Sequence, residues 1–341
     1  MPKDVAIFDY EVISNISNHI LKLRNDSKDS AYRAINYESI ILYYKTGEYL
    51  NNILKLHNYG DGCIAEIAKR ISAIDPTIKG FDKRNLYRMR QFYLTYPDFE
   101  IVSTLLTQLN WSCNVTIMHR SKSESERMFY INLAIREHYS VRELNRQIDS
   151  AYYQRTLLST ESLKPSKMPD TIKHEFMDTY VLDFLNVSKQ YSEKDLQSAI
   201  VSNLRDFILE FGKDFAFVGQ EYRISVGNKD YYLDLLFFHR GLSCLVNIEL
   251  KIGEFKPEYM GKMEFYLEAL DREIKKPHEN PSVGIILCAG KDDEVVEYAM
   301  SRSMSPTLVA EYQLVLPNKE LLEQKLKEYS QMIEMEAQNG P

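Results

Sequence analysis

The run from Tyr232 to Lys251, YLDLLFFHRGLSCLVNIELK, constrains the fold more than any other part of the chain. Leu, Phe, Val and Ile dominate it, and runs of this kind are typical of strands that are covered on both faces. The pattern predicts strands over residues 233–238 and 243–250, joined by a turn at 239–242 that contains Gly241. We therefore expect a β-hairpin that lies between other layers of structure.

Three charged residues interrupt this apolar hairpin, namely Asp234 in the first strand and Glu249 and Lys251 in the second. Side chains alternate along a strand, so Glu249 and Lys251 point to the same face. A two-residue loop at Arg240-Gly241 places Asp234 opposite Asn247, on the face of Glu249 and diagonal to it. A three-residue loop would move Asp234 to the other face, so the cluster depends on the register of the hairpin.

Two carboxylates and an ammonium group between apolar layers are costly unless a further charge compensates them. A divalent cation does so, and Mg²⁺, with Mn²⁺ as a substitute, prefers carboxylate oxygens and retained waters. The pattern indicates phosphodiester hydrolysis, with Asp234 and Glu249 as the metal ligands. Lys251 would orient the attacking water or neutralise charge that develops on the phosphate. The alternative interpretation of these residues is a plain salt bridge on a half-exposed strand.

The chain around the hairpin predicts an α/β domain with an αβββαβ core. The expected order is a helix over 192–211, strands over 215–226, 231–238 and 243–251, a helix over 258–271 and a strand over 282–289. Gly227-Asn228 supplies the first hairpin turn. A helix over 293–303, a strand over 308–316 and a last helix from Asn318 follow, and residues 171–190 are expected to enter the domain as a short helix.

Residues 1–156 predict a mostly α-helical N-terminal domain, in which Ala31, Ile35, Leu42 and Tyr49 fall on one narrow arc of a helix. A change to Ser, Thr, Lys and Pro marks residues 157–170 as a linker, and residues 171–341 form the second domain.

A short helix over 64–74, a turn and a basic helix capped by Asp82 favour a helix-turn-helix-like module for DNA binding or dimerisation. The residues that we expect to contact nucleic acid are Lys83, Arg84, Arg88 and Gln91, with Arg90 alongside. An amphipathic helix with a solvated basic face explains the same pattern, and the long turn weakens the DNA-binding interpretation.

The composition indicates in which cell compartment and with which partners the protein is expected to act. The net charge of −7 does not advertise nucleic-acid binding, but the N-terminal half has a small excess of Lys and Arg, so a basic patch is expected there. No leader-like segment and no apolar run long enough for a bilayer are evident, and the four cysteines are widely spaced. We expect a cytoplasmic protein without a membrane-bound part.

The pattern of Asp, then Glu-x-Lys across a hairpin, resembles the PD-(D/E)xK nuclease superfamily. The longer run FAFVGQEYRISVG…YYLDLLFFHRGLSCLVNIELKIGEFKPEYMGKMEFYLEALD, with GFDKRNLYRMRQFY, LLTQLNWS and SERMFYINLAIREHYSVRELNRQI in the N-terminal half, resembles the bacterial YhcG-type nucleases. The resemblance implies a restriction-endonuclease-like C-terminal domain behind a helical N-terminal domain. The resemblance does not settle the substrate. From the site we expect a Mg²⁺-dependent endonuclease that acts on DNA, with an RNA-cutting toxin or defence effector as a further alternative. A homodimer is expected because cutting both strands of a duplex needs two sites.

Two positions depart from the pattern that the resemblance implies. Relatives commonly have a glutamate on the helix before the sheet, where this chain has Gln197, and Glu193 one turn earlier is the expected replacement. On the crossover helix Lys262 and Tyr266 lie one turn apart, and Lys262 is expected to meet phosphate. These departures keep an alternative open, a catalytically inactive nuclease fold that binds DNA or serves as a scaffold.

Overall fold

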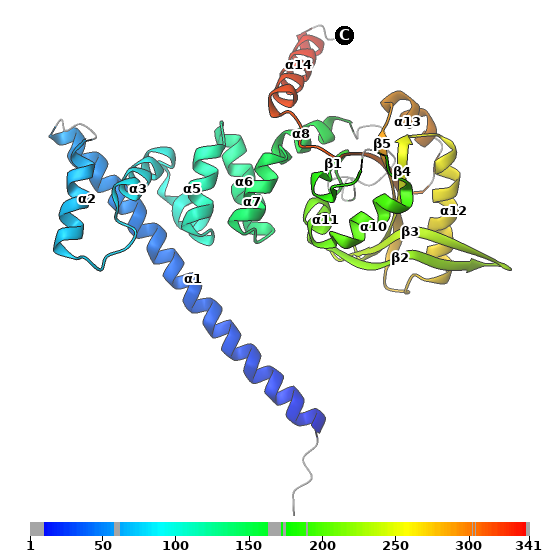
Figure 1. Ribbon diagram of the computed structural model, residues 1–341, viewed down its shortest axis with the longest axis horizontal. Coiled ribbons are helices and arrows are strands. Elements are labelled where there is room, and N and C mark those ends of the chain that lie inside the picture. The colour runs from blue at the N-terminus through cyan, green and yellow to red at the C-terminus, as the bar shows by residue number, and fades with distance from the viewer. Residues whose placement is uncertain are drawn as a thin grey trace, which may run out of the picture. The chain divides into compact units, whose positions relative to one another are not determined.

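The structure is a computed structural model that describes residues 10–57, 62–162, 172, 175–188, 190–301, 303 and 305–338. It divides into two compact units, residues 1–144 and residues 145–341 (Figure 1). Across the described ranges, none of the helices combines the length and the apolar character needed to cross a bilayer.

The first unit is helical, as the sequence predicts. Its elements are α1 (Tyr10–Leu56), α2 (Gly62–Ile74), α3 (Lys83–Thr95), α4 (Phe99–Thr104), the 3₁₀ turn η1 (Leu106–Gln108), α5 (Trp111–Arg120), α6 (Glu124–Arg136) and the start of α7 (Val141–Asp149).

The packing of α3 on α1 forms the core of this unit. Gly47 makes the close approach possible, because a Cβ at this position would lie 2.0 Å from the carbonyl oxygen of Met89. The predicted apolar arc on α1 is wrong: Ile35, Leu42 and Tyr49 are exposed. The buried face of α1 is instead the one that meets α3, α4 and η1, and it consists of Ile40, Ile41, Tyr44, Leu50 and Leu54.

The predicted helix, turn and basic helix are present as α2, residues 75–82 and α3. Asp82 caps α3 as predicted, because its side chain accepts a hydrogen bond from the backbone N–H of Asn85 at 3.1 Å. Leu86, Met89 and Phe92 face inward, whereas Lys83 and Arg84 are exposed and Arg88 and Arg90 are partly buried.

The second unit is a mixed sheet covered by helices on both faces (Figure 1). The strands are β1 (Thr179–Val181), β2 (Phe215–Val226), β3 (Lys229–His239), β4 (Cys244–Glu254), β5 (Asn280–Gly290) and β6 (Thr307–Gln313), in the order β1-β6-β5-β4-β3-β2. The helices are α8 (Tyr152–Ser162), α10 (Glu193–Ser202), α11 (Leu204–Phe211), α12 (Glu258–Glu273), α13 (Asp293–Met300) and α14 (Lys319–Gln338), with the 3₁₀ turn η2 (Asp183–Leu185).

The αβββαβ order is confirmed, with β2, β3 and β4 antiparallel in sequence and β5 parallel to β4 across the helix α12. Residues of α10 and α11, among them Leu196 and Phe207, pack against one face of the sheet. Residues of α12, among them Met260 and Met263, pack against the other. The strands between the two helical layers are therefore buried on both sides, which explains their near-continuous apolar sequence.

Two local expectations need correction. The helix expected over 192–211 is two helices that meet at Asn203. Of the short helix expected within 171–190, residue 172 is helical, whereas residues 179–181 and 183–185 form β1 and η2. β1 pairs in parallel with β6 over three residues, and a strand this short has no sequence pattern of its own.

The two compact units divide after residue 144, whereas the domain boundary at 156 that composition suggests stays a prediction. Arg146 and Arg155 both bind the buried carboxylate of Glu210, through Nη1 to Oε2 at 2.8 Å and Nη1 to Oε1 at 2.7 Å. Glu210 lies on α11, so these contacts hold residues 145–156 in the second unit. Of the expected linker 157–170, residues up to 162 belong to α8, and the remainder lies outside the described residues.

Candidate active site

The candidate site lies where β3 and β4 stop pairing with one another. Their paired residues run from His239 opposite Cys244 to Leu235 opposite Ile248. Beyond this point two backbone carbonyls of β3 accept hydrogen bonds from side chains: Tyr232 from the Tyr266 hydroxyl at 3.1 Å, and Asp234 from Gln197 Nε2 at 2.6 Å. Tyr266 comes from α12 and Gln197 from α10, so both helical layers bind β3 where it leaves β4.

The register of the hairpin differs from the predicted one, but the predicted face is preserved. Asn247 lies opposite Leu236 and not opposite Asp234, because the loop contains residues 240–243 and not two residues. A shift of two residues leaves every side chain on the same face. Continuing the observed register by one pair brings Asp234 level with Glu249, directly across the strands.

The wider loop is held by contacts that local sequence does not reveal. The backbone N–H of Arg240 donates to the carbonyl of Asp214, and the N–H of Asn280 donates to that of Ser243, each at 2.9 Å. His239, a residue of the predicted turn, accepts a hydrogen bond through Nδ1 from the N–H of Leu242 at 3.1 Å. Tertiary contacts at both ends of the loop therefore set the register.

Asp234 reaches from β3 to the backbone of β4. Its Oδ2 accepts a hydrogen bond from the N–H of Leu250 at 2.9 Å. Burial raises the pKa of Asp234 above its ordinary value, although this hydrogen bond and the charges of Lys251 and Lys262 act in the opposite direction. The carboxyl group thus spans the separated strands and is only partly compensated.

Glu249 is the most deeply buried acid of the site, with 2% of the residue exposed. Its Oε2 accepts a hydrogen bond from Lys262 Nζ at 2.6 Å, whereas Oε1 is buried and has no hydrogen-bond partner among the residues that the structure describes. Burial raises the pKa of Glu249, and the nearby charge of Asp234 raises it further. A buried carboxylate oxygen without a partner is costly, so this oxygen is able to accept a further hydrogen bond or positive charge.

Lys251 lies at the end of the same face of β4. Its ammonium group donates to the carbonyl of Leu250 at 2.6 Å and lies 3.3 Å from Glu193 Oε2 and 5.5 Å from the ring centre of Tyr259. Glu193, the expected replacement for the acid missing at Gln197, therefore contacts Lys251. Gln197 itself binds the backbone of β3.

The helix α12 brings Lys262 and Tyr266 to the site. This helix packs closely against the sheet, because a Cβ on Gly284 of β5 would lie 2.5 Å from the sulfur of Met263. Burial lowers the pKa of Lys262, but the Glu249 carboxylate outweighs that effect and holds the pKa above its ordinary value. Lys262 also lies 5.0 Å from the ring centre of Tyr266, so it is fixed between an acid and an aromatic ring.

The arrangement supplies two carboxylates and two ammonium groups in a largely buried place. Among the residues that the structure describes, no group of three His, Cys, Asp or Glu side chains is placed to hold a metal ion. A cation bound here would rely on Asp234 and Glu249, with waters or backbone oxygens completing its shell, which is the usual way in which Mg²⁺ binds.

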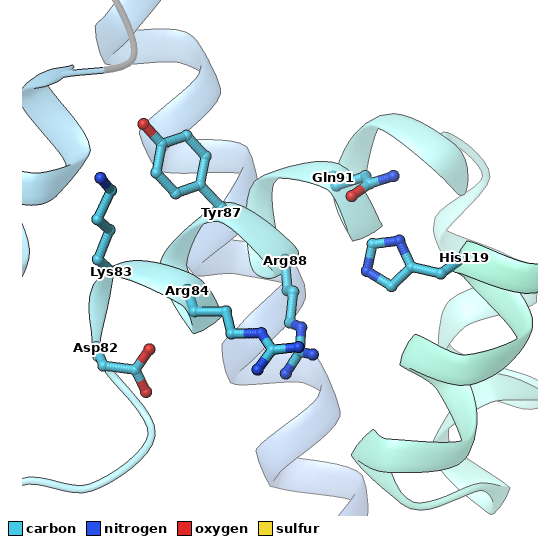
Figure 2. A pocket seen from close by; sticks show the side chains of 7 residues that line it. All are labelled: Asp82, Lys83, Arg84, Tyr87, Arg88, Gln91 and His119. Atoms are coloured by element: carbon cyan, nitrogen blue, oxygen red, sulfur yellow. The ribbon is translucent and has the colours of Figure 1, made fainter.

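The residues expected to contact nucleic acid belong to the other unit. Lys83, Arg84, Arg88 and Gln91 line one cavity on α3, and Arg90 is not among the residues that line it (Figure 2). His119, from α5, also lines this cavity, and sequence reasoning missed it because nothing in the sequence indicates which helix packs beside α3.

Comparison with known proteins assigns both units. Residues 173–327 match the YhcG PDDEXK nuclease domain, and residues 19–155 match the DUF1016 N-terminal domain. The chain is 31% identical to the protein named "Putative nuclease YhcG" of Escherichia coli strain K12, over 91% of this chain and 92% of that protein. The chain belongs to the YhcG family. Its second unit is a restriction-endonuclease-like α/β domain of the PDDEXK nuclease type, and its first is the helical domain of the same family.

Solved structures with partial similarity include a repair endonuclease from Pyrococcus abyssi, at 17% identity and a TM-score of 0.25, over 39% of this chain and 50% of that one. EndoMS in its apo form matches at 16% identity and a TM-score of 0.24, over 39% of this chain and 49% of that one.

Proposed function

We propose that this protein is an endonuclease that hydrolyses phosphodiester bonds of DNA with the help of Mg²⁺, for which Mn²⁺ can substitute. The observation that carries the proposal is the pair of Asp234 and Glu249 at the point where β3 leaves β4, with Glu249 Oε1 buried and unpartnered. Membership of a nuclease family supports the same conclusion.

The two carboxyl groups fit a divalent cation. Burial raises the pKa of each, and the charge of Asp234 adds to the effect on Glu249, so a positive charge between them would relieve both burial and repulsion. Asp234 and Glu249 would hold the ion. When bound, Mg²⁺ supplies a Lewis acid that polarises the phosphate and lowers the pKa of a coordinated water.

The lysines act on the charge of the substrate. Lys251 is held by Leu250 and Glu193 beside the carboxylates, where its ammonium group stabilises negative charge that develops on the phosphate or orients the attacking water. Lys262 neutralises Glu249 until a cation takes over that role, and is then able to contact a phosphate oxygen. Tyr266 fixes β3 and contacts Lys262, which makes it a positioning residue.

The helical unit is proposed to bind the DNA through Lys83, Arg84, Arg88 and Gln91, with Arg90 in a supporting position. It is also proposed to form a homodimer through α1. Every residue from 16 to 35 of α1 is exposed, and Ile16, Ile20 and Leu23 share one face. The same spacing continues through Ser27, Ser30 and Ala34 to Tyr37, so we propose that this face forms the seam of a coiled coil, with two serines among its positions. A cytoplasmic location completes the proposal.

The test is a cleavage assay with isosteric variants. Asp234→Asn and Glu249→Gln should each reduce cleavage of plasmid DNA in Mg²⁺ by at least about 100-fold, because each removes a charge that holds the metal. The amide introduced at position 234 can still accept the hydrogen bond from Leu250, so folding should survive, and circular dichroism checks that it does. Lys251→Met should bind metal and turn over slowly.

Glu254→Gln is the matched control, because Glu254 is an exposed acid on the same strand. Glu254→Gln should cleave at the wild-type rate. Chelation with EDTA should abolish cleavage by the wild type and by Glu254→Gln. Single-stranded DNA and RNA, assayed in Mg²⁺ and in Mn²⁺, identify the substrate. Full cleavage by both Asp234→Asn and Glu249→Gln would contradict the assigned site.

A second candidate function is a DNA-binding or scaffolding protein that no longer cuts. Two observations favour it: Gln197 presents an amide where relatives commonly have an acid, and Lys262 already occupies one oxygen of Glu249. Binding without cleavage of plasmid, single-stranded DNA and RNA under every metal tested would establish this function.

A further inference from the structure

The cavity on the first unit is lined almost entirely by cations and hydrogen-bonding groups. Its volume is about 780 Å³, and it is lined by Asp82, by Lys83, Arg84, Tyr87, Arg88 and Gln91 of α3, and by His119 of α5. In the view of Figure 2, the guanidinium groups of Arg84 and Arg88 lie at the same end of the cavity, and His119 comes from a neighbouring helix. The volume of this cavity lies within the range of small-molecule sites.

The cations of this cavity are not compensated. In the part of the chain that the structure describes, Lys83, Arg84 and Arg88 have no carboxylate within ion-pair distance; Arg88 Nη1 lies 3.5 Å from Asn85 Oδ1, and Lys83 lies 5.9 Å from the ring centre of Tyr87. The one acid among the lining residues, Asp82, accepts hydrogen bonds from Asn85 as the cap of α3.

Uncompensated like charges indicate the sign of the ligand. Arg84 and Arg88 are one turn apart, where two positive charges repel and destabilise a helix. Burial lowers the pKa of His119, and the charges of Arg88 and Arg84 lower it further, so these guanidinium groups act on the space between the two helices. An anion in the cavity would remove the repulsion.

The shape of the cavity narrows the class of anion. Two guanidinium groups and an ammonium group match the oxygens of a phosphate. The ring of Tyr87 and the amide of Gln91 add an aromatic wall and a hydrogen-bonding group, which inorganic phosphate does not need and a nucleotide does. We infer that this cavity binds the phosphate of a nucleotide, either a free mononucleotide or the 5′-phosphorylated end of a nucleic acid chain.

The inference rests on the proposed nuclease function only where it selects a nucleotide over other phosphate compounds. Nucleotide binding and DNA cleavage can be tested separately. Binding is measured with the full chain in EDTA, where cleavage is suppressed, by fluorescence anisotropy of a short labelled oligonucleotide. Two forms of that oligonucleotide, with a 5′-phosphate and with a 5′-hydroxyl, are compared at pH 8, and AMP serves as the competitor.

The wild-type protein should bind the phosphorylated form more tightly. The double variant Arg84→Gln/Arg88→Gln should lose at least about tenfold in affinity for it and less than about twofold for the hydroxyl form, because a hydrogen bond to a charged group is worth ~1.5–3 kcal/mol. His119→Ala tests the shape of the cavity without changing the charge, since the lowered pKa leaves His119 neutral at pH 8. It should weaken binding about fivefold.

The control is Lys45→Gln/Lys79→Gln, which removes the same charge from exposed lysines of the same unit. It should stay within about twofold of the wild type. Displacement of the oligonucleotide by AMP assigns the site to free nucleotides, and failure of AMP assigns it to the chain end; either outcome supports a nucleotide-phosphate site. Equal losses for both oligonucleotide forms, or for both double variants, would overturn it. Loss of cleavage with intact binding would instead reject only the nuclease proposal.

Discussion

The contact between Glu249 and Lys262 holds this acid in place and at the same time occupies one of its two carboxylate oxygens. Lys262 neutralises the buried carboxylate at a distance of 2.6 Å, so a metal ion has to compete with an ammonium group for the same oxygen. The lysine is 44% exposed and the glutamate 3%, so solvent screens the pair from one side only. Exposed ion pairs stabilise a protein by ~0.2–1 kcal/mol, and we expect a metal ion to have to overcome a free energy of this size to displace Lys262 from Glu249.

Lys262→Met should therefore strengthen metal binding in the absence of nucleic acid, by up to about fivefold. Titration of Mn²⁺ by isothermal calorimetry at pH 8, where protons compete little for the carboxylates, measures the change. Lys256→Met is the control, because Lys256 precedes the same helix and is exposed. Weaker Mn²⁺ binding by Lys262→Met would mean that the lysine organises Glu249 for the metal and does not compete with it.

The residues of the candidate site can be predicted from sequence because charge within an apolar strand is costly and therefore informative. Asp234, Glu249 and Lys251 stand out on that ground alone, and the structure brings them to one place. The partner of Glu249 is harder to predict, since the position of Lys262 on its helix suggests a contact with phosphate and not with an acid. The unpartnered Oε1 of Glu249 becomes evident only when the packing of α12 is known.

At the level of elements, strands with continuous apolar runs can be placed from sequence, whereas their register cannot. The sequence His239-Arg240-Gly241 suggests a tight turn, but hydrogen bonds to Asp214 and from Asn280 widen the loop. The apolar face of α1 is misplaced for a similar reason: burial depends on where α3 lies, and Gly47 marks that contact better than the apolar residues do.

The exposed part of α1 leads to a prediction about assembly. Residues 16–35 extend for about 30 Å as helix, and helices gain most of their stability from packing. A second copy of the chain fits as the cover, because Ile16, Ile20 and Leu23 recur at coiled-coil spacing. Arg33 and Glu38 also occupy flanking positions where opposite charges meet across a parallel pair.

Ile16→Gln/Ile20→Gln/Leu23→Gln should convert a dimer into a monomer, measured by sedimentation equilibrium. The control Asn18→Gln/Lys22→Gln/Asn25→Gln changes the opposite face of the same helix and should leave the dimer intact. A protein that is monomeric before any substitution, or a dimer that survives the first triple variant, would contradict this role of α1.

At the scale of the whole molecule, the order of the domains follows from the sequence, but the place where the compact units divide does not. Composition marks the polar residues after 156 as a linker, yet Arg146 and Arg155 belong with the second unit through Glu210. Glu210 also accepts a hydrogen bond from the backbone N–H of Val181 at 2.7 Å. In the sequence, this network is indicated only by Glu210, the single acid in the apolar helix segment FILEF. Its presence does not indicate which residues bind it.

The division can be tested with two fragments, residues 141–341 and residues 157–341. The shorter one lacks both arginines and leaves the carboxylate of Glu210 buried without a counter-charge, which typically costs about 3–5 kcal/mol. Urea denaturation should show this loss in the free energy of unfolding. Glu210→Gln should then act with opposite signs: it destabilises the longer fragment, where it removes a paired charge, and stabilises the shorter one, where it removes an orphaned charge while still accepting from Val181. Equal stabilities of the two fragments, or the same sign of the Glu210→Gln effect in both, would place the boundary at 156 after all and reduce the arginines to surface contacts.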